Sequence, residues 1–137
     1  MKEGKRAART APAKRVLAID TDRAFLTAVR RVVESGSCRV DLAHSAAEAR
    51  GCIRRHHYDL VISELSMPQL DAVALFARLD KAMLKGTRLL FLSSTRPSHE
   101  MRSFLDEHHL SYLDKPVHLR RFLDKLEDLL HKEEEEP

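Results

Sequence analysis

The chain has 137 residues, of which 43% are hydrophobic and 33% are charged, and its formal net charge is +3. This length fits one domain with its own core and excludes a need for disulfide or metal staples. No apolar run approaches the about 18 residues of a membrane-spanning helix, and no apolar leader opens the chain, so we expect a cytoplasmic protein without a membrane role. Cys38 and Cys52 lack metal-ligand spacing, and we expect two reduced thiols.

The two ends of the chain carry opposite charges. Lysine and arginine dominate residues 1–14, whereas residues 132–137 read KEEEEP. Such segments hold too little apolar surface to offset the entropy of ordering, so we expect a disordered basic arm over 1–14 and an acidic tail over 132–137. The arm is interpreted as a solubility tail, with contact to nucleic acid or to an acidic partner as the alternative. No aromatic residue interleaves with its basic ones, so we do not expect nucleic acid to stack there.

Short apolar runs alternate with helical patterns along residues 15–131, which is typical of β-α-β units around a parallel sheet. The predicted strands lie at residues 16–19, around 40–42, 60–62, 89–92 and 112–113. The first, third and fourth are continuously apolar, as expected of central strands that are buried on both faces. Polar residues alternate in the second, and the fifth is short, so we predict that these two form the edges of the sheet.

Between the strands, apolar residues recur at the helical period of 3.6 residues. They are Phe25, Val29, Val32 and Val33 in the first helix, Ala72, Phe76, Leu79 and Met83 in the third, and Leu119, Phe122, Leu123, Leu126, Leu129 and Leu130 in the last. Ser45 and Glu48 have the spacing of a capping box that opens the second helix, while Met101, Phe104 and Leu105 mark the fourth. The pattern predicts an α/β fold: a single flavodoxin-like (βα)5 domain over 15–131 with a doubly wound parallel sheet in strand order 2-1-3-4-5.

In an open parallel sheet, ligands bind beyond the carboxyl ends of the strands, where the strand order reverses. Polar residues directly follow four predicted strands: Asp20, Thr21 and Asp22; Glu64; Ser93, Ser94 and Thr95; and Asp114 with Lys115. Acids, hydroxyls and one lysine would converge there on a crevice suited to a phosphate or a hard cation. We do not expect an enzyme, because neither a nucleotide-binding glycine fingerprint nor a nucleophile–base pair is evident.

The ordered segments 16–20, 59–71, 92–93 and 112–116 resemble those of receiver domains of bacterial two-component response regulators, and the resemblance covers residues 15–131. It implies an acidic pair after strand one that holds Mg²⁺ and an aspartate after strand three that accepts a phosphoryl group from a histidine kinase. A Ser/Thr and a Lys would bind the phosphoryl oxygens, and an aromatic residue on strand five would act as a switch. The matching positions are Asp20, Ser93, Lys115 and Tyr112.

The first departure from the family pattern concerns the metal site. Thr21 stands where the second metal-binding acid belongs, so one carboxylate is missing. Asp22 could compensate, but we expect it to point away from that position, because side chains alternate in direction along an extended segment. Mg²⁺ prefers carboxylates, waters and phosphate in octahedral geometry. We therefore expect no cofactor and no metal site, with weak Mg²⁺ binding through Asp20 at most.

The second departure is Glu64, which stands where the phosphoacceptor aspartate belongs. Its extra methylene moves the carboxylate by about 1.5 Å, and a displacement of that order can cost about 10²-fold in rate. We interpret Glu64 as a permanent negative charge near Lys115, close to where a phosphoryl oxygen would lie. The alternative is an ordinary strand-end carboxylate, solvated or paired with Lys115, that does not affect conformation. Gln69 and Ala72 are softer departures, at positions where the family usually has glycine.

We therefore predict a stand-alone receiver-like module that acts in signal transduction through phosphorylation-independent protein–protein interaction. The resemblance places its interaction surface on the fourth helix, the fifth strand and the fifth helix. Basic and imidazole side chains there could meet an acidic protein partner: Arg96, His99, Arg102, His118, Arg120 and Arg121. A second copy of the chain could also bind this face and form a homodimer. Two alternatives are a functional phosphoacceptor served by a histidine kinase and a DNA-binding accessory protein that uses the basic arm, whose affinity would fall steeply with salt.

Overall fold

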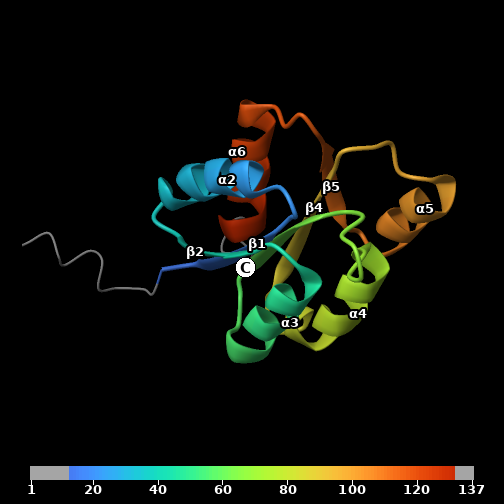
Figure 1. Ribbon diagram of the computed structural model, residues 1–137, viewed down its shortest axis with the longest axis horizontal. Helices are drawn as coiled ribbons and strands as arrows, with labels where there is room; N and C mark the ends of the chain where they lie inside the picture. The colour runs from blue at the N-terminus through green and yellow to red at the C-terminus, as the bar shows by residue number, and fades with distance from the viewer. Residues whose placement is uncertain (1–12, 132–137) are drawn as a thin grey trace, which may run out of the picture.

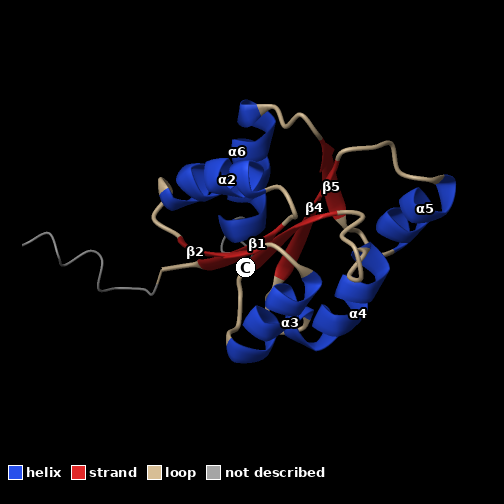
Figure 2. Ribbon diagram, in the orientation of Figure 1, coloured by secondary structure: helices blue, strands red, loops and turns tan. Residues whose placement is uncertain are grey.

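A five-stranded parallel sheet in the order β2-β1-β3-β4-β5 organises the computed structural model, which describes residues 13–131 (Figure 2). The strands are β1 (Arg15–Ile19), β2 (Arg39–Ala43), β3 (Leu60–Glu64), β4 (Arg88–Ser93) and β5 (Ser111–Asp114). The helices are α2 (Arg23–Glu34), α3 (Ala46–Arg55), α4 (Ala72–Met83), α5 (His99–Glu107) and α6 (Leu119–His131). The predicted flavodoxin-like fold and strand order are confirmed. The acidic tail lies outside the described residues, as do all but the last two residues of the basic arm. The alternative of DNA binding depends on that arm and therefore also concerns residues outside the described range.

The helices cover both faces of the sheet. Helices α2 and α6 lie on one face, and α3, α4 and α5 lie on the other (Figure 1). Two clusters of buried apolar side chains fill the spaces between these layers. Val16 and Leu17 on β1 are both fully buried, one in each cluster, because successive side chains of a strand point to opposite faces. This explains why the central strands are continuously apolar in sequence.

Short polar side chains fix the residues at which the helices begin. Four of them accept a hydrogen bond from the backbone N–H three residues later, at 2.9–3.2 Å: Asp22, Ser45, Asp71 and Ser98. The predicted start of the second helix at Ser45 is confirmed. Its partner Glu48 accepts from the N–H of His44, at 2.6 Å, one residue before the position that a capping box requires. All four caps lie in loops that follow strands β1 to β4, so they anchor the loops at the carboxyl edge of the sheet.

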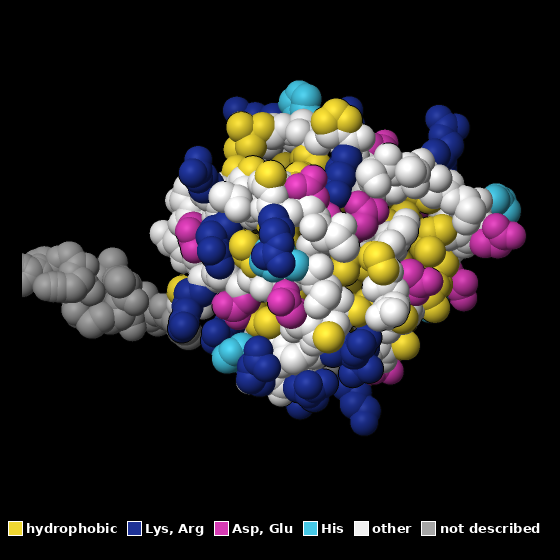
Figure 3. All heavy atoms as spheres, viewed as in Figure 1, with side chains coloured by type: hydrophobic (Ala, Val, Ile, Leu, Met, Phe, Trp, Pro, Cys, Tyr) yellow, Lys and Arg dark blue, Asp and Glu magenta, His cyan; other side chains and the backbone are white. Residues whose placement is uncertain are grey.

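The predicted apolar stripe of α6 is wider than the face that the sheet covers. Phe122, Leu126 and Leu130 are buried, whereas Leu119 and Leu123 are 58% and 38% exposed. A helix packed on one layer buries one stripe of its surface, and residues at the margin of that stripe stay in contact with water. Figure 3 shows apolar side chains at the surface over the start of α6. None of the helices within residues 13–131 combines the length and apolar content needed to cross a membrane.

Candidate functional site

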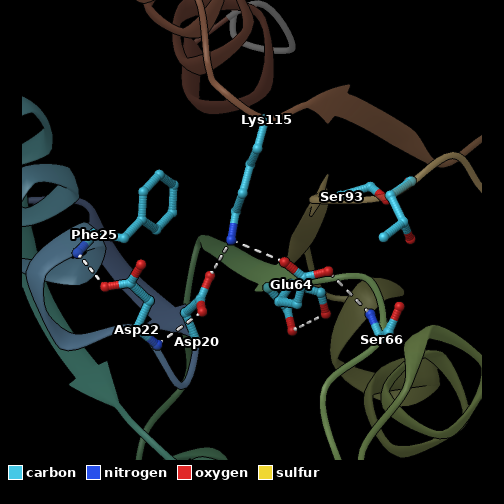
Figure 4. A network of polar contacts seen from close by, with 9 residues as sticks. Asp20, Asp22, Phe25, Glu64, Ser66, Ser93 and Lys115 are labelled. Carbon is cyan, nitrogen blue, oxygen red and sulfur yellow. Dashed lines mark hydrogen bonds and ion pairs between the residues drawn. The ribbon is translucent and has the colours of Figure 1, made fainter.

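The candidate site lies at the carboxyl edge of the sheet, where three strands end close together. Asp20 follows β1, Glu64 is the last residue of β3, and Lys115 follows β5. The strand order reverses at β1, because β2 lies on one side of it and β3 lies on the other. The carboxyl ends of β1 and β3 therefore border a crevice. The ammonium Nζ of Lys115 lies 2.6 Å from Oδ2 of Asp20 and 2.8 Å from Oε1 of Glu64 (Figure 4). One lysine therefore bridges the two carboxylates.

The bridge is largely shielded from water. The exposed fractions of the side chains are 16% for Lys115, 5% for Asp20 and 12% for Glu64. Burial lowers the pKa of Lys115, but hydrogen bonds to Asp20 and then Glu64 outweigh that effect and raise the pKa above its ordinary 10.5. Lys115 is therefore charged at neutral pH, and the three side chains together carry one excess negative charge.

Each carboxylate uses its second oxygen for a backbone N–H. Oδ1 of Asp20 accepts from the N–H of Asp22 at 3.0 Å, and Oε2 of Glu64 accepts from the N–H of Ser66 at 3.4 Å. The ring of Phe25, in the first turn of α2, lies with its centroid 4.3 Å from Nζ of Lys115 (Figure 4). This cation–π contact covers one side of the ammonium group with an aromatic ring.

The positions of the degenerate acidic pocket, Asp20, Thr21 and Asp22, have separate surroundings in the structure. The carboxylate of Asp22 caps α2 by accepting from the N–H of Phe25, and Thr21 is exposed. Both oxygens of Asp20 already have partners. Within residues 13–131, no group of three or more His, Cys, Asp and Glu side chains is placed to hold a metal ion. The residues present thus do not fit the pair of carboxylates that the resemblance requires for Mg²⁺.

Ser93 and Tyr112 lie on a neighbouring wall, away from the bridge. Ser93 ends β4 and is buried, and its hydroxyl donates to the backbone carbonyl of Thr95 in the following loop. Tyr112 is half-buried on β5. Together with Lys115, both line a hollow of about 400 Å³. The structure thus brings Asp20, Glu64 and Lys115 into contact. Ser93 and Tyr112 line the neighbouring hollow, and among the described residues their side chains form no hydrogen bond with the bridge.

The six side chains of the predicted interaction face are all exposed. They come from the β4–α5 loop, α5, the loop before α6, and the first turn of α6: Arg96, His99, Arg102, His118, Arg120 and Arg121. One of them has a local role, because Nδ1 of His118 accepts from the N–H of Arg121 at 3.5 Å near the start of α6. The two helix starts thus present a mainly basic surface.

Phe25 is the site residue that the sequence-based prediction missed. Its place in the apolar stripe of the first helix predicts packing against the sheet, and it does contribute to the core on that side. The available signal was its position five residues after Asp20, in the first turn of the helix that leaves the site. A ring at that point can reach the strand ends as well as the core.

Known proteins resemble the chain over nearly its whole described length. A family model for the response regulator receiver domain matches residues 16–127. The response regulator MprA of Mycobacterium tuberculosis is 30% identical over 122 residues, which cover 86% of this chain and 51% of that protein. The MprA protein of Mycobacterium leprae is 29% identical over 118 residues, with the same coverage. The chain spans about half the length of these curated relatives.

Solved structures share the fold. A CheY-like response regulator receiver domain protein from Methanospirillum hungatei superimposes with a TM-score of 0.80 at 24% identity, over 92% of this chain and 100% of the other. The non-phosphorylated HemR receiver domain from Leptospira biflexa gives 0.75 at 25% identity, over 86% and 94%. With the match of the family model and the strand-end site, these findings show that the chain belongs to the response regulator receiver domain family of two-component signalling.

Proposed function

We propose that this receiver domain signals by binding a protein partner without being phosphorylated, and that Glu64 acts as a fixed charge where the family carries a phosphoacceptor aspartate. The observation that carries the proposal is the bridge from Lys115 to Glu64 and Asp20, at 2.8 and 2.6 Å. Exposed ion pairs usually contribute less than about 1 kcal/mol, whereas breaking a buried pair costs about 3–5 kcal/mol. Because all three side chains are mostly buried, we expect breaking the bridge to cost an energy closer to that of a buried ion pair than to that of an exposed one.

The surroundings of Glu64 favour a structural role over a chemical one. Phosphoryl transfer depends mainly on the placement of the reacting oxygen and on charge neutralisation by a metal ion. Both oxygens of Glu64 are engaged, one by Lys115 and one by the N–H of Ser66. The second carboxylate of the expected metal site is absent at Thr21. The proposal therefore includes neither a phosphoryl group on Glu64 nor Mg²⁺ as a cofactor.

The output of the domain would come from its surface. Receiver domains are signalling proteins that work through partners such as kinases, rather than typical enzymes. The basic face formed by α5, β5 and the start of α6 suits an acidic segment of a partner protein, or a second copy with acidic groups at the contact. Charges at the rim of an interface mainly accelerate association, and their effect weakens as salt rises. We therefore expect partner binding through this face to depend on ionic strength.

Labelling with a small phosphodonor tests the proposal. The protein is incubated with Mg²⁺ and radiolabelled acetyl phosphate, beside a variant that restores both family residues, Thr21→Asp with Glu64→Asp. We expect label on the double variant and none above background on the natural protein, because only the variant has a correctly placed aspartate and a second metal-binding carboxylate. Thr21→Asp with Glu64→Gln is the matched control and should stay unlabelled. Mg²⁺-dependent label on Glu64 of the natural protein would contradict the proposal.

A further inference from the structure

A hollow of about 400 Å³ lies next to the bridge, between the β4–α5 loop, the first turn of α5 and β5. Its polar lining includes two arginines, three serine or threonine residues, one tyrosine, one aspartate and the lysine of the bridge: Arg96, Arg102, Ser93, Ser94, Thr95, Tyr112, Asp114 and Lys115. Pockets for small organic ligands have volumes of about 300–1,000 Å³. The hollow is therefore large enough for a small molecule and too large to be explained by one or two waters.

The lining offers more free hydrogen-bond donors than acceptors. Among the described residues, no side chain forms an ion pair or hydrogen bond with the guanidinium groups of Arg96 or Arg102. The hydroxyls of Ser94 and Thr95 likewise have no partner within residues 13–131. Lys115 also borders the hollow, but its ammonium is committed to the bridge. Asp114 is the single carboxylate that opposes the two arginines in this lining.

We propose that the hollow binds a small phosphate monoester without a covalent bond, with its phosphate group held by Arg96 and Arg102. A guanidinium group presents a planar fork of donors that matches two phosphate oxygens. Two such forks and the two hydroxyls of Ser94 and Thr95 line the same hollow, and together they suit a group with at least three acceptor oxygens. A phosphate dianion supplies three such oxygens and a single carboxylate does not. The volume beyond the phosphate leaves room for an organic group along the ring of Tyr112.

Occupancy would change the surface of the domain. Arg96 and Arg102 are two of the six basic or imidazole side chains of the interaction face, and a bound phosphate would neutralise both. A phosphate monoester would then compete with an acidic protein partner. That competition rests on the proposed function, whereas the binding itself depends only on the hollow and its lining.

The test is an NMR titration of the natural protein at low salt with adenosine monophosphate, inorganic phosphate and adenosine as separate probes. No phosphodonor and no partner are present, so a failure here leaves the role of Glu64 untouched. We expect saturable shifts at Ser94, Thr95 and Tyr112 with both phosphate probes and none with adenosine. Adenosine monophosphate binding about tenfold more tightly than phosphate supports a monoester, since contacts of the organic group worth about 1.4 kcal/mol give that ratio. Equal affinities would overturn the monoester in favour of free phosphate.

Paired variants distinguish phosphate binding by the two arginines of the hollow from a general effect of positive surface charge. Arg96→Gln with Arg102→Gln removes the two proposed ligands, and Arg120→Gln with Arg121→Gln removes the same charge from the exposed start of α6. We expect the first pair to weaken binding about tenfold or more, because hydrogen bonds between charged groups are roughly twice as strong as those between neutral groups. The second pair should stay within about twofold. Equal losses in both pairs, or no loss in the first, would overturn the proposal.

Discussion

Replacement of Lys115 by methionine tests the bridge in the candidate site. Methionine keeps most of the aliphatic stem and removes the ammonium group, so Asp20 and Glu64 would face each other without a counter-ion. Both oxygens touch the same nitrogen, at 2.6 and 2.8 Å. They therefore lie no more than 5.4 Å apart, the sum of these two distances, and two like charges at that distance repel by about 3 kcal/mol at an effective dielectric constant of about 20.

The expected loss is somewhat smaller than this repulsion. Glu64 keeps 12% of its side chain exposed, so its carboxylate can turn toward water and relieve part of the repulsion. We predict that Lys115→Met lowers the free energy of unfolding by about 2–3 kcal/mol, below the range of about 3–5 kcal/mol for a fully buried pair. Adding Glu64→Gln should recover at least about 1 kcal/mol, because removal of one carboxylate also removes the repulsion.

Urea unfolding followed by far-UV circular dichroism measures these changes, since the chain contains no tryptophan. Lys81→Met, an exposed lysine on α4, is the control and should change stability by less than about 0.5 kcal/mol. If Lys115→Met costs no more than this control, the bridge is solvated and does not stabilise the fold. If Glu64→Gln fails to recover stability in the double variant, repulsion between the carboxylates is not the cause of the loss.

Two further predictions concern pH and backbone strain. The pKa of Lys115 is raised in the folded protein above its ordinary 10.5, so its contribution to stability is fully present below that unfolded value and is lost as pH rises through the folded value. The natural protein should therefore lose more stability than Lys115→Met in alkaline urea titrations, and parallel pH curves would refute this. Gln69 has a φ of 64°, in the left-handed region, so Gln69→Gly should raise the free energy of unfolding by about 0.5–1 kcal/mol. Gln69→Ala keeps that strain, and a similar gain from it would point to another cause.

Strand order and the strand-end residues could be predicted from the sequence because they follow from local patterns. Continuous apolar runs indicate strands buried on both faces, and parallel strands place their carboxyl ends at one edge of the sheet. The residues after these runs, Asp20, Glu64 and Lys115, consequently meet in the structure. Short polar residues such as Ser45 mark the helix starts for an equally local reason, because they satisfy free backbone N–H groups.

What the sequence could not predict depends on which neighbour each side chain finds in three dimensions. The hydroxyl of Ser93 turns to the carbonyl of Thr95 and away from the bridge, a choice set by the path of the loop. Phe25 serves both the core and the ammonium group of Lys115. Leu119 belongs to the apolar pattern of α6 but lies beyond the surface that the sheet covers. The periodicity of apolar residues predicts which face of a helix packs against the sheet, but it does not predict how much of that face the sheet covers.

The most direct measurement of the central claim is an amide NMR titration of the natural protein with Mg²⁺, followed by Mg²⁺ with beryllofluoride, a phosphoryl mimic. The account predicts that the resonances of Asp20, Glu64, Ser93, Tyr112 and Lys115 stay in place through millimolar additions, because the bridge already occupies the site and one metal-binding carboxylate is absent. Concerted shifts of these resonances, with those around Tyr112 following, would show a working phosphoryl site and contradict the phosphorylation-independent account.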